Sequence, residues 1–294
     1  MSIPRNTSCA WLLGGLLATA LPGCRPASEV VCIEGSDTMV NLAQGWAENY
    51  HAAHPEAVIQ ISGGGSGVGI ASLIDGNCDI ASASRKMMGS EIARVRARRH
   101  REPREIVVGY DALAVYVHRD NPLESISLEE LAEIYGDGGR ITRWSQLGVS
   151  PGRLGSDTIV RVSRQNSSGT YVYFREAVMG KHREYKLGSI DQNGSVDVVA
   201  LVANTPSAIG YSGMGYAIPG VKMLKISKRP GEPGVAPTVE NAKKREGGYL
   251  ITRPLLLYTA GQPKPKARAL LDWILDVPGQ KVVAELGYVP VRDL

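Results

Sequence analysis

One local pattern constrains the fold more than any other, and it occurs three times along the chain. An apolar strand pattern is followed by a short turn of glycine and hydroxyl residues and then by a helical pattern. The turns lie at 35–38 (GSDT), 64–67 (GGSG) and 168–170 (SGT). Strands that alternate with helices across such short turns are typical of a parallel sheet covered by helices. The sequence therefore predicts an α/β fold.

The same three turns have the chemistry of an anion site. Small residues let backbone N–H groups approach a ligand closely, and a helix N-terminus carries about half a positive charge. Hydroxyl groups add donors, and Arg164 precedes the third turn by four residues. A further strand, expected at 78–83, ends at Ser84 and Arg85. Together these groups would hold a tetrahedral oxyanion, although any single turn is equally an ordinary helix cap.

The N-terminal 23 residues have the features of a secretory signal peptide. The apolar run at 10–21 is too short to span a bilayer core of about 30 Å, but it fits the apolar region of a signal. It ends at LPGC (21–24), which resembles a bacterial lipobox. Cys24 would then carry lipid (diacylglycerol and palmitate) and anchor the mature chain. The alternative is signal cleavage nearby with Cys24 unmodified.

Cysteine usage fits an exported protein. Cys9 would leave with the signal and Cys24 would carry lipid, which leaves Cys32 and Cys78. An even pair in an oxidising compartment permits a disulfide, and both residues lie at or beside expected strands. Two buried free thiols are the alternative, and the sequence does not decide between them.

The formal charge of +4 comes from two short segments. The arginine-rich helix expected at 89–105 contributes +3 and Arg5 contributes the remainder. The rest of the chain is neutral, so no basic surface suited to nucleic acid is predicted. The arginine-rich helix is interpreted as a solvated face, with a patch for anionic membrane or a partner as the alternative.

A phosphate-ester hydrolase is the enzymatic alternative. His51 and His54 lie three residues apart on an expected helix, as two metal ligands would. The five histidines show no metal-ligand motif, and no G-x-S-x-G nucleophile or phosphate-binding P-loop occurs. We therefore expect no catalytic residue, no metal and no cofactor.

Six motifs, in order along the chain, carry a family resemblance. The sequence resembles the substrate-binding lipoproteins of the bacterial high-affinity phosphate ABC transporter. The motifs are IEGSDTM (33–39), ISGGGSGVGI (61–70), CDIASASRKM (78–87), RQNSSGT (164–170), AIGYSGM (208–214) and GQKVVAELGYVPV (279–291).

This resemblance implies a type II periplasmic-binding fold, in which two α/β lobes joined by a hinge enclose a ligand cleft. After the signal peptide at 1–23, the first lobe would cover 24–112, the second 113–222, and the chain would return to the first lobe over 223–294. The implied protein is a lipid-anchored extracytoplasmic monomer that binds inorganic phosphate and delivers it to a permease. The phosphate-binding residues carried over from the family are Ser36, Asp37, Thr38, Ser66, Gly67, Ser84, Arg85, Arg164, Ser168, Gly169 and Thr170.

One position departs from the family pattern. Some phosphate binders place an aspartate where this chain has Ser84, and that carboxylate accepts the proton of HPO₄²⁻ and repels fully ionised sulfate. Asp37 and Asp111 are the two carboxylates that would take this role here. A binder of another tetrahedral oxyanion, or a phosphate sensor, therefore stays open as the alternative function.

Overall fold

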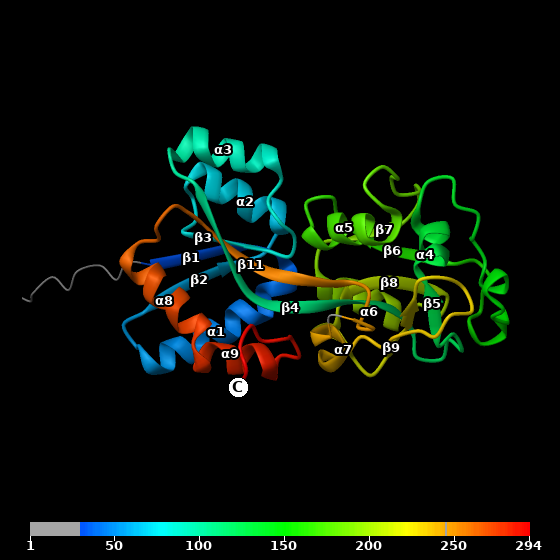
Figure 1. The fold of residues 1–294 in the computed structure, drawn as a ribbon. Helices are drawn as coiled ribbons and strands as arrows, with labels where there is room; N and C mark the ends of the chain where they lie inside the picture. The colour runs from blue at the N-terminus through cyan, green and yellow to red at the C-terminus, as the bar shows by residue number, and fades with distance from the viewer. Residues whose placement is uncertain (1–29, 245) are drawn as a thin grey trace, which may run out of the picture.

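The protein is built from two α/β lobes that lie side by side (Figure 1). The structure is a computed structural model that describes residues 30–244 and 246–294. The expected signal peptide and Cys24 lie outside these residues. No helix in the described ranges has the length and apolar character needed to cross a membrane.

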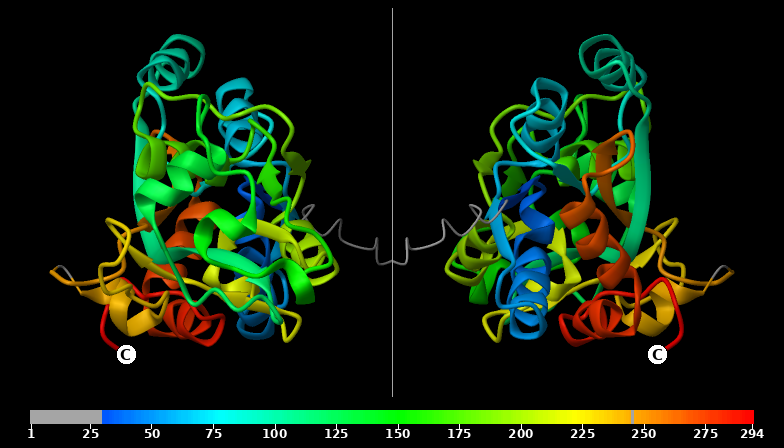
Figure 2. Two further views of the ribbon diagram at one scale, coloured as in Figure 1. Left: turned by 90° about the vertical axis from the view of Figure 1, so that its right-hand side faces the viewer. Right: turned by 90° about the vertical axis from the view of Figure 1, so that its left-hand side faces the viewer.

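The first lobe begins with three parallel-paired strands, as the sequence predicts. They are β1 (Val30–Gly35), β2 (Val58–Ser62) and β3 (Ile80–Ala83), and β1 pairs in parallel with both neighbours. Side chains of β1 alternate between the two faces, so Val31 and Ile33 enter one core while Cys32 packs against the other. The helices of this lobe are α1 (Val40–Ala53), α2 (Ser66–Asp75), α3 (Gly89–Arg99), α8 (Pro265–Leu275) and α9 (Val277–Glu285). In both side views α3 stands at the outer edge of this lobe (Figure 2).

Two long strands run from one lobe into the other. The strand β4 (Pro103–His118) pairs antiparallel with β11 (Thr252–Ala260). Beyond Ala112, β4 continues into the second lobe and pairs with β8 (Ala208–Gly213) over Leu113–Val117. The lobes are thus joined through a shared sheet in the order β2-β1-β3-β11-β4-β8-β6-β7.

The second lobe repeats the α/β pattern around an aromatic core. Its parallel strands are β6 (Val160–Arg164), which pairs with β8, and β7 (Ile190–Gln192). Phe174, the single phenylalanine of the chain, stacks on Tyr211 with ring centroids 3.8 Å apart. The helices are α4 (Leu128–Tyr135), α5 (Gly169–Phe174) with a π-helical turn at Arg175–Met179, and α6 (Ser195–Ala203). Short 3-10 turns lie at Asp37–Met39, Trp144–Leu147, Pro151–Arg153 and Met214–Tyr216.

The return to the first lobe comes later than the expected residue 223. Leu224, Ile226, Tyr249 and Ile251 are all buried in the core of the second lobe. Two short strands of the second lobe lie here: β9 (Val221–Met223), which pairs with β4, and β10 (Lys225–Ser227), which pairs with β5 (Ser125–Ser127). The short helix α7 (Val239–Lys243) follows these strands in the chain. These pairings are long-range, so the local pattern alone could not show them.

Candidate functional site

The first group of site residues lies where β1, β2 and β3 end. Ser36 follows β1, and its N–H donates to the backbone oxygen of Ser82 at 3.0 Å. The preceding residue, Gly35, has a φ of +142°, and a Cβ there would collide with the same oxygen. Glycine is therefore required for the turn to pass this close to β3.

Three serine hydroxyls form a buried cluster at these strand ends. Ser36 Oγ donates to Ser84 Oγ at 3.1 Å, and the Ser84 N–H donates to Ser66 Oγ at 3.0 Å. The hydroxyls of Ser66 and Ser84 are 3.4 Å apart. All three residues are at most 2% exposed. A hydroxyl both donates and accepts, so this cluster can meet either a protonated or an unprotonated oxygen of a ligand.

The second lobe places α5 directly against this serine cluster. Ser168 is the N-cap of α5, and its hydroxyl accepts from the Thr170 N–H at 3.1 Å. A Cβ on Gly169 would collide with Ser66 Oγ and lie 2.7 Å from Ser84 Oγ. The site therefore lies at the contact between the lobes, and we call it the inter-lobe site.

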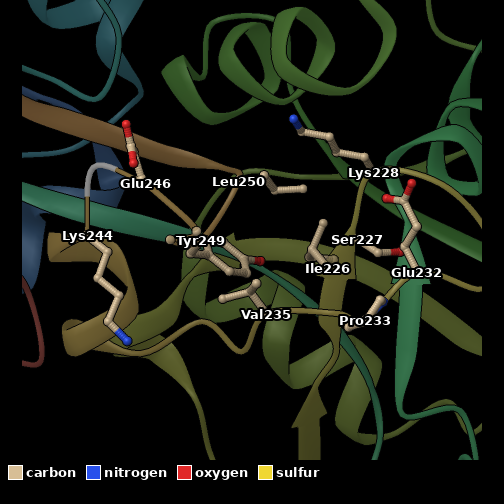
Figure 3. A pocket seen from close by; sticks show the side chains of 12 residues that line it. Ile226, Ser227, Lys228, Glu232, Pro233, Val235, Lys244, Glu246, Tyr249 and Leu250 are labelled. Carbon is tan, nitrogen blue, oxygen red and sulfur yellow. The ribbon is translucent and has the colours of Figure 1, made fainter.

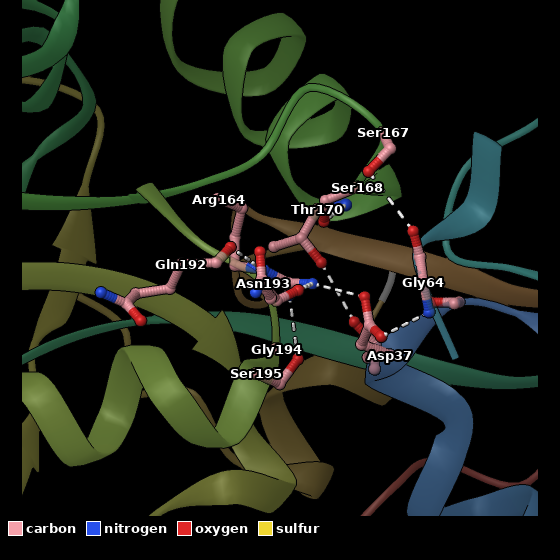
Figure 4. A network of polar contacts seen from close by, with 12 residues as sticks. Asp37, Gly64, Arg164, Ser167, Ser168, Thr170, Gln192, Asn193, Gly194 and Ser195 are labelled. Atoms are coloured by element: carbon pink, nitrogen blue, oxygen red, sulfur yellow. Dashed lines mark hydrogen bonds and ion pairs between the residues drawn. The ribbon is translucent and has the colours of Figure 1, made fainter. Parts of the chain in front are cut away.

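Several hydrogen bonds cross from one lobe to the other at the inter-lobe site. Arg164 Nη2 donates to Asp37 Oδ2 at 2.7 Å (Figure 4). The hydroxyl oxygens of Thr38 and Thr170 are 3.0 Å apart. The Gly67 N–H donates to the Ser167 oxygen at 2.9 Å. The structure thus brings together residues from all three of the glycine and hydroxyl turns.

Arg164 is the last residue of β6, and oxygen atoms of its own lobe fix its guanidinium. Its guanidinium donates to Gln192 O at 3.3 Å, to Ser195 Oγ at 3.1 Å and to Asn193 O at 2.7 Å (Figure 4). Burial lowers the pKa of the Arg164 guanidinium, and the neighbouring Asp37 carboxylate opposes that change. A planar guanidinium in this setting keeps its charge and its fixed fork of donors.

Arg85, the second expected guanidinium, is engaged by a helix of its own lobe. Its Nη1 and Nη2 donate to the two carboxylate oxygens of Glu91 at 2.8 and 2.7 Å. Glu91 also caps α3 by accepting from the Met88 N–H at 2.8 Å. Arg85 lies beside Gly67 at the edge of the inter-lobe site, and its contact with an anion stays a prediction.

Asp37 and Asp111, the two aspartates expected to accept a proton from the ligand, both accept hydrogen bonds within the protein. Asp37 Oδ1 accepts from the Gly64 N–H at 2.9 Å, and its other oxygen accepts from Arg164. Asp111 lies on β4 and is fully buried. Burial raises the pKa of its carboxyl, while the guanidinium of Arg253 lowers it.

Arg253, which no sequence motif predicts as a site residue, contacts residues of both lobes in the inter-lobe site. It is fully buried on β11 and donates to Asp111 Oδ2 through Nε at 3.0 Å and Nη2 at 2.8 Å. The same guanidinium donates to Thr170 Oγ1 at 3.0 Å and to Thr38 Oγ1 at 3.2 Å. The only signal in the sequence is one arginine within the otherwise apolar strand TRPLLLYTA.

Cys32 and Cys78 are both free thiols in the structure. The structure therefore has no disulfide between these two residues. The Cys78 thiol donates to the Gly69 oxygen at 3.8 Å. Burial raises the pKa of Cys78 to about 12.

The two histidines considered as metal ligands make other contacts. His51 Nδ1 is 3.0 Å from the Ala57 oxygen, and the ring of His54 packs on Tyr50 with centroids 4.4 Å apart. Within residues 30–244 and 246–294, no group of three or more His, Cys, Asp or Glu side chains could hold a metal ion.

A cavity of about 530 Å³ on the second lobe is separate from the inter-lobe site. It is lined by Ile226, Tyr249 and Leu250 together with the oppositely charged Lys228 and Glu232 (Figure 3). None of the expected phosphate-binding residues lines it.

Comparison with known proteins places this chain in a family. A family model described as PBP superfamily domain matches residues 23–277. The phosphate-binding protein PstS of Pseudomonas aeruginosa is 32% identical over 285 residues, which cover 92% of this chain and 87% of the relative. The chain belongs to the PstS family of phosphate-binding proteins. PstS of Bacillus subtilis is 30% identical over 275 residues, covering 92% of this chain and 84% of that protein.

A solved structure agrees with this PstS assignment. The phosphate ABC transporter substrate-binding protein with bound phosphate from Clostridium perfringens matches with a TM-score of 0.77 and 28% identity. The match covers 90% of this chain and all of that one. The resemblance and the fold class inferred from the sequence are thus confirmed.

Proposed function

We propose that this PstS family member binds inorganic phosphate at the inter-lobe site. The observation that carries the proposal is the convergence of donors from both lobes, with Arg164 and the Thr170 hydroxyl facing Asp37, Thr38 and the serine cluster. Hydrogen bonds to a charged group contribute about 1.5–3 kcal/mol each, and micromolar binding needs about 8 kcal/mol net. About eight or more such donors are sufficient once the cost of ordering the site is counted. The proposed ligand set remains Ser36, Asp37, Thr38, Ser66, Gly67, Ser84, Arg85, Arg164, Ser168, Gly169 and Thr170.

The proposed mechanism is closure of the lobes around the ligand. The chain passes between the lobes along β4 and β11, so bending there changes the distance between the two halves of the site. A ligand that contacts both lobes binds the closed form better and shifts the equilibrium toward it by that difference in affinity. A permease that recognises the closed form would then receive only loaded protein.

We propose that the mature chain works outside the cytoplasmic membrane as a lipid-anchored monomer. The LPGC motif, with Cys24 as the lipidated residue, supports the anchor. Partnership with an ABC transporter permease is supported by the relatives, which include a phosphate ABC transporter substrate-binding protein.

Another tetrahedral oxyanion is the second candidate ligand, and one observation favours keeping it. Both candidate carboxylates, Asp37 and Asp111, already accept hydrogen bonds from arginines. A serine hydroxyl of the buried cluster would then accept the proton of HPO₄²⁻, and a hydroxyl does not repel sulfate as a carboxylate does.

Uptake of radiolabelled phosphate tests the proposed delivery. We expect cells that express this chain with its permease to take up phosphate from dilute medium, and cells that lack either component to lose that uptake. Phosphate binding without any effect on uptake would contradict delivery and favour the sensor alternative.

A further inference from the structure

Arg253 and Asp111 are direct neighbours on the two strands that join the lobes. Their Cα atoms are register partners of β11 and β4, so both side chains project from the same face of the sheet. Both residues are fully buried, and the pair is electrically neutral. A buried charge is tolerated when it is paired and hydrogen-bonded in this way.

The guanidinium of Arg253 reaches one threonine from each lobe. It donates to Thr38 Oγ1 at 3.2 Å in the first lobe and to Thr170 Oγ1 at 3.0 Å in the second. The backbone of Thr38 is fixed as well, because the hydroxyls of Tyr288 and Tyr216 donate to the carbonyl oxygen of Thr38 at 2.8 and 3.1 Å. The two threonine hydroxyls therefore have defined positions relative to Arg253.

The direction of these hydrogen bonds follows from the chemistry of arginine. A guanidinium has only donors, so both threonine oxygens must accept from it. Each hydroxyl has one proton, and the two hydroxyl oxygens are 3.0 Å apart, so one threonine donates its proton to the other. The remaining hydroxyl proton is then directed away from Arg253. A hydroxyl oriented in this way donates to an anion and is poorly placed to accept a proton from one.

We propose that Arg253 is a positioning residue that orients the hydrogen-bonded pair of Thr38 and Thr170 hydroxyls, so that the pair donates its one remaining proton toward the bound anion. This end of the inter-lobe site then takes an unprotonated oxygen of phosphate. The protonated oxygen is left to face the buried hydroxyls of Ser36, Ser66 and Ser84. The inference rests on the proposed phosphate site and assigns an orientation to the ligand within it.

A double-mutant cycle tests whether Arg253 acts through the two hydroxyls. One arm carries Asp111→Asn with Arg253→Met, which removes the ion pair without leaving a buried charge. The other arm carries Thr38→Val with Thr170→Val, and the last variant combines all four changes. Phosphate affinity is measured by calorimetry, and thermal unfolding reports whether each variant is folded.

We expect the variant with Asp111→Asn and Arg253→Met to bind phosphate about tenfold or more weakly when the threonines are present. With the valines in place, the same change should alter affinity by less than about threefold. Equal losses in both backgrounds would overturn the inference alone, since Arg253 would then act without the threonines. No phosphate binding by the unmodified chain would overturn the proposed function as well.

Arg253→Lys provides the test if the variant with Asp111→Asn and Arg253→Met does not fold. A lysine keeps a cation for Asp111, but its single ammonium lacks the fork that reaches both threonines. We expect this variant to unfold at nearly the same temperature and to lose about tenfold or more in phosphate affinity. Unchanged affinity in Arg253→Lys would overturn the inference.

Discussion

Asp37 and Arg164 come from different lobes and form an ion pair at 2.7 Å across the inter-lobe site. Asp37 follows β1 and is 17% exposed, whereas Arg164 ends β6 and is 1% exposed. The contact joins the two halves of the site through a charged hydrogen bond. An anion near Arg164 would therefore lie beside the residues that bring the lobes together.

Arg164→Ala is expected to weaken phosphate binding by at least about tenfold, because the change removes charged donors from the site. Calorimetry measures the affinity, and circular dichroism checks that the fold is kept. Arg153→Ala is the matched control, since Arg153 is an exposed arginine in a 3-10 turn of the same lobe. Unchanged affinity in Arg164→Ala would show that Arg164 is misplaced in the proposed site.

Gly169→Ala is expected to weaken phosphate binding while leaving thermal stability nearly unchanged. The added Cβ would collide with Ser66 Oγ and Ser84 Oγ of the other lobe, so it opposes closure more than folding of either lobe. Gly152→Ala is the control, because a Cβ at Gly152 meets no atom within 4 Å. Full affinity in Gly169→Ala would contradict the close contact between α5 and the serine cluster.

The Cys78 thiol is expected to react slowly with iodoacetamide in the folded protein. Burial raises its pKa to about 12, so at pH near 8 it has far less thiolate than an ordinary cysteine with a pKa of about 8.5. Its reaction rate should still rise with pH where a free cysteine has levelled off. After denaturation without reductant, both Cys32 and Cys78 should be alkylated. Protection of both until reductant is added would show that they form a disulfide.

Cys24→Ser is expected to release the protein from membranes, because it removes the thiol that would carry lipid. Membrane and soluble fractions of expressing cells are compared by immunoblot. Cys9→Ser is the control, since this residue would leave with the signal peptide and its change should not alter the distribution. A Cys24→Ser variant that stays with the membrane fraction would refute the lipobox interpretation.

Local patterns in the sequence were sufficient for much of the fold and for most of the proposed site. The strand expected at 78–83 is β3, and the arginine-rich helix expected at 89–105 begins at Gly89 as α3, because periodicity is a local signal. That helix ends at Arg99, and Pro103 already belongs to β4. The turns after β1, β2 and β6 were recognised for the same reason.

Features that depend on distant pairing could not be predicted in this way. Arg253 contacts Thr38 and Thr170, which are far from it in the chain, and only the β4–β11 register places it between them. The late return to the first lobe depends likewise on β9 and β10 pairing with β4 and β5. The sequence shows that Ser84 departs from the family pattern. It does not show that Ser84 is hydrogen-bonded to Ser36 and Ser66, because these residues lie far from it in the chain.

Donors from both lobes are proposed to hold phosphate, and a calorimetric titration of the unmodified chain measures that binding. Phosphate and sulfate are titrated separately into ligand-free protein. We expect phosphate to bind with a micromolar or lower Kd, which corresponds to about 8 kcal/mol or more. A titration in which phosphate shows no binding below millimolar concentration would contradict the account.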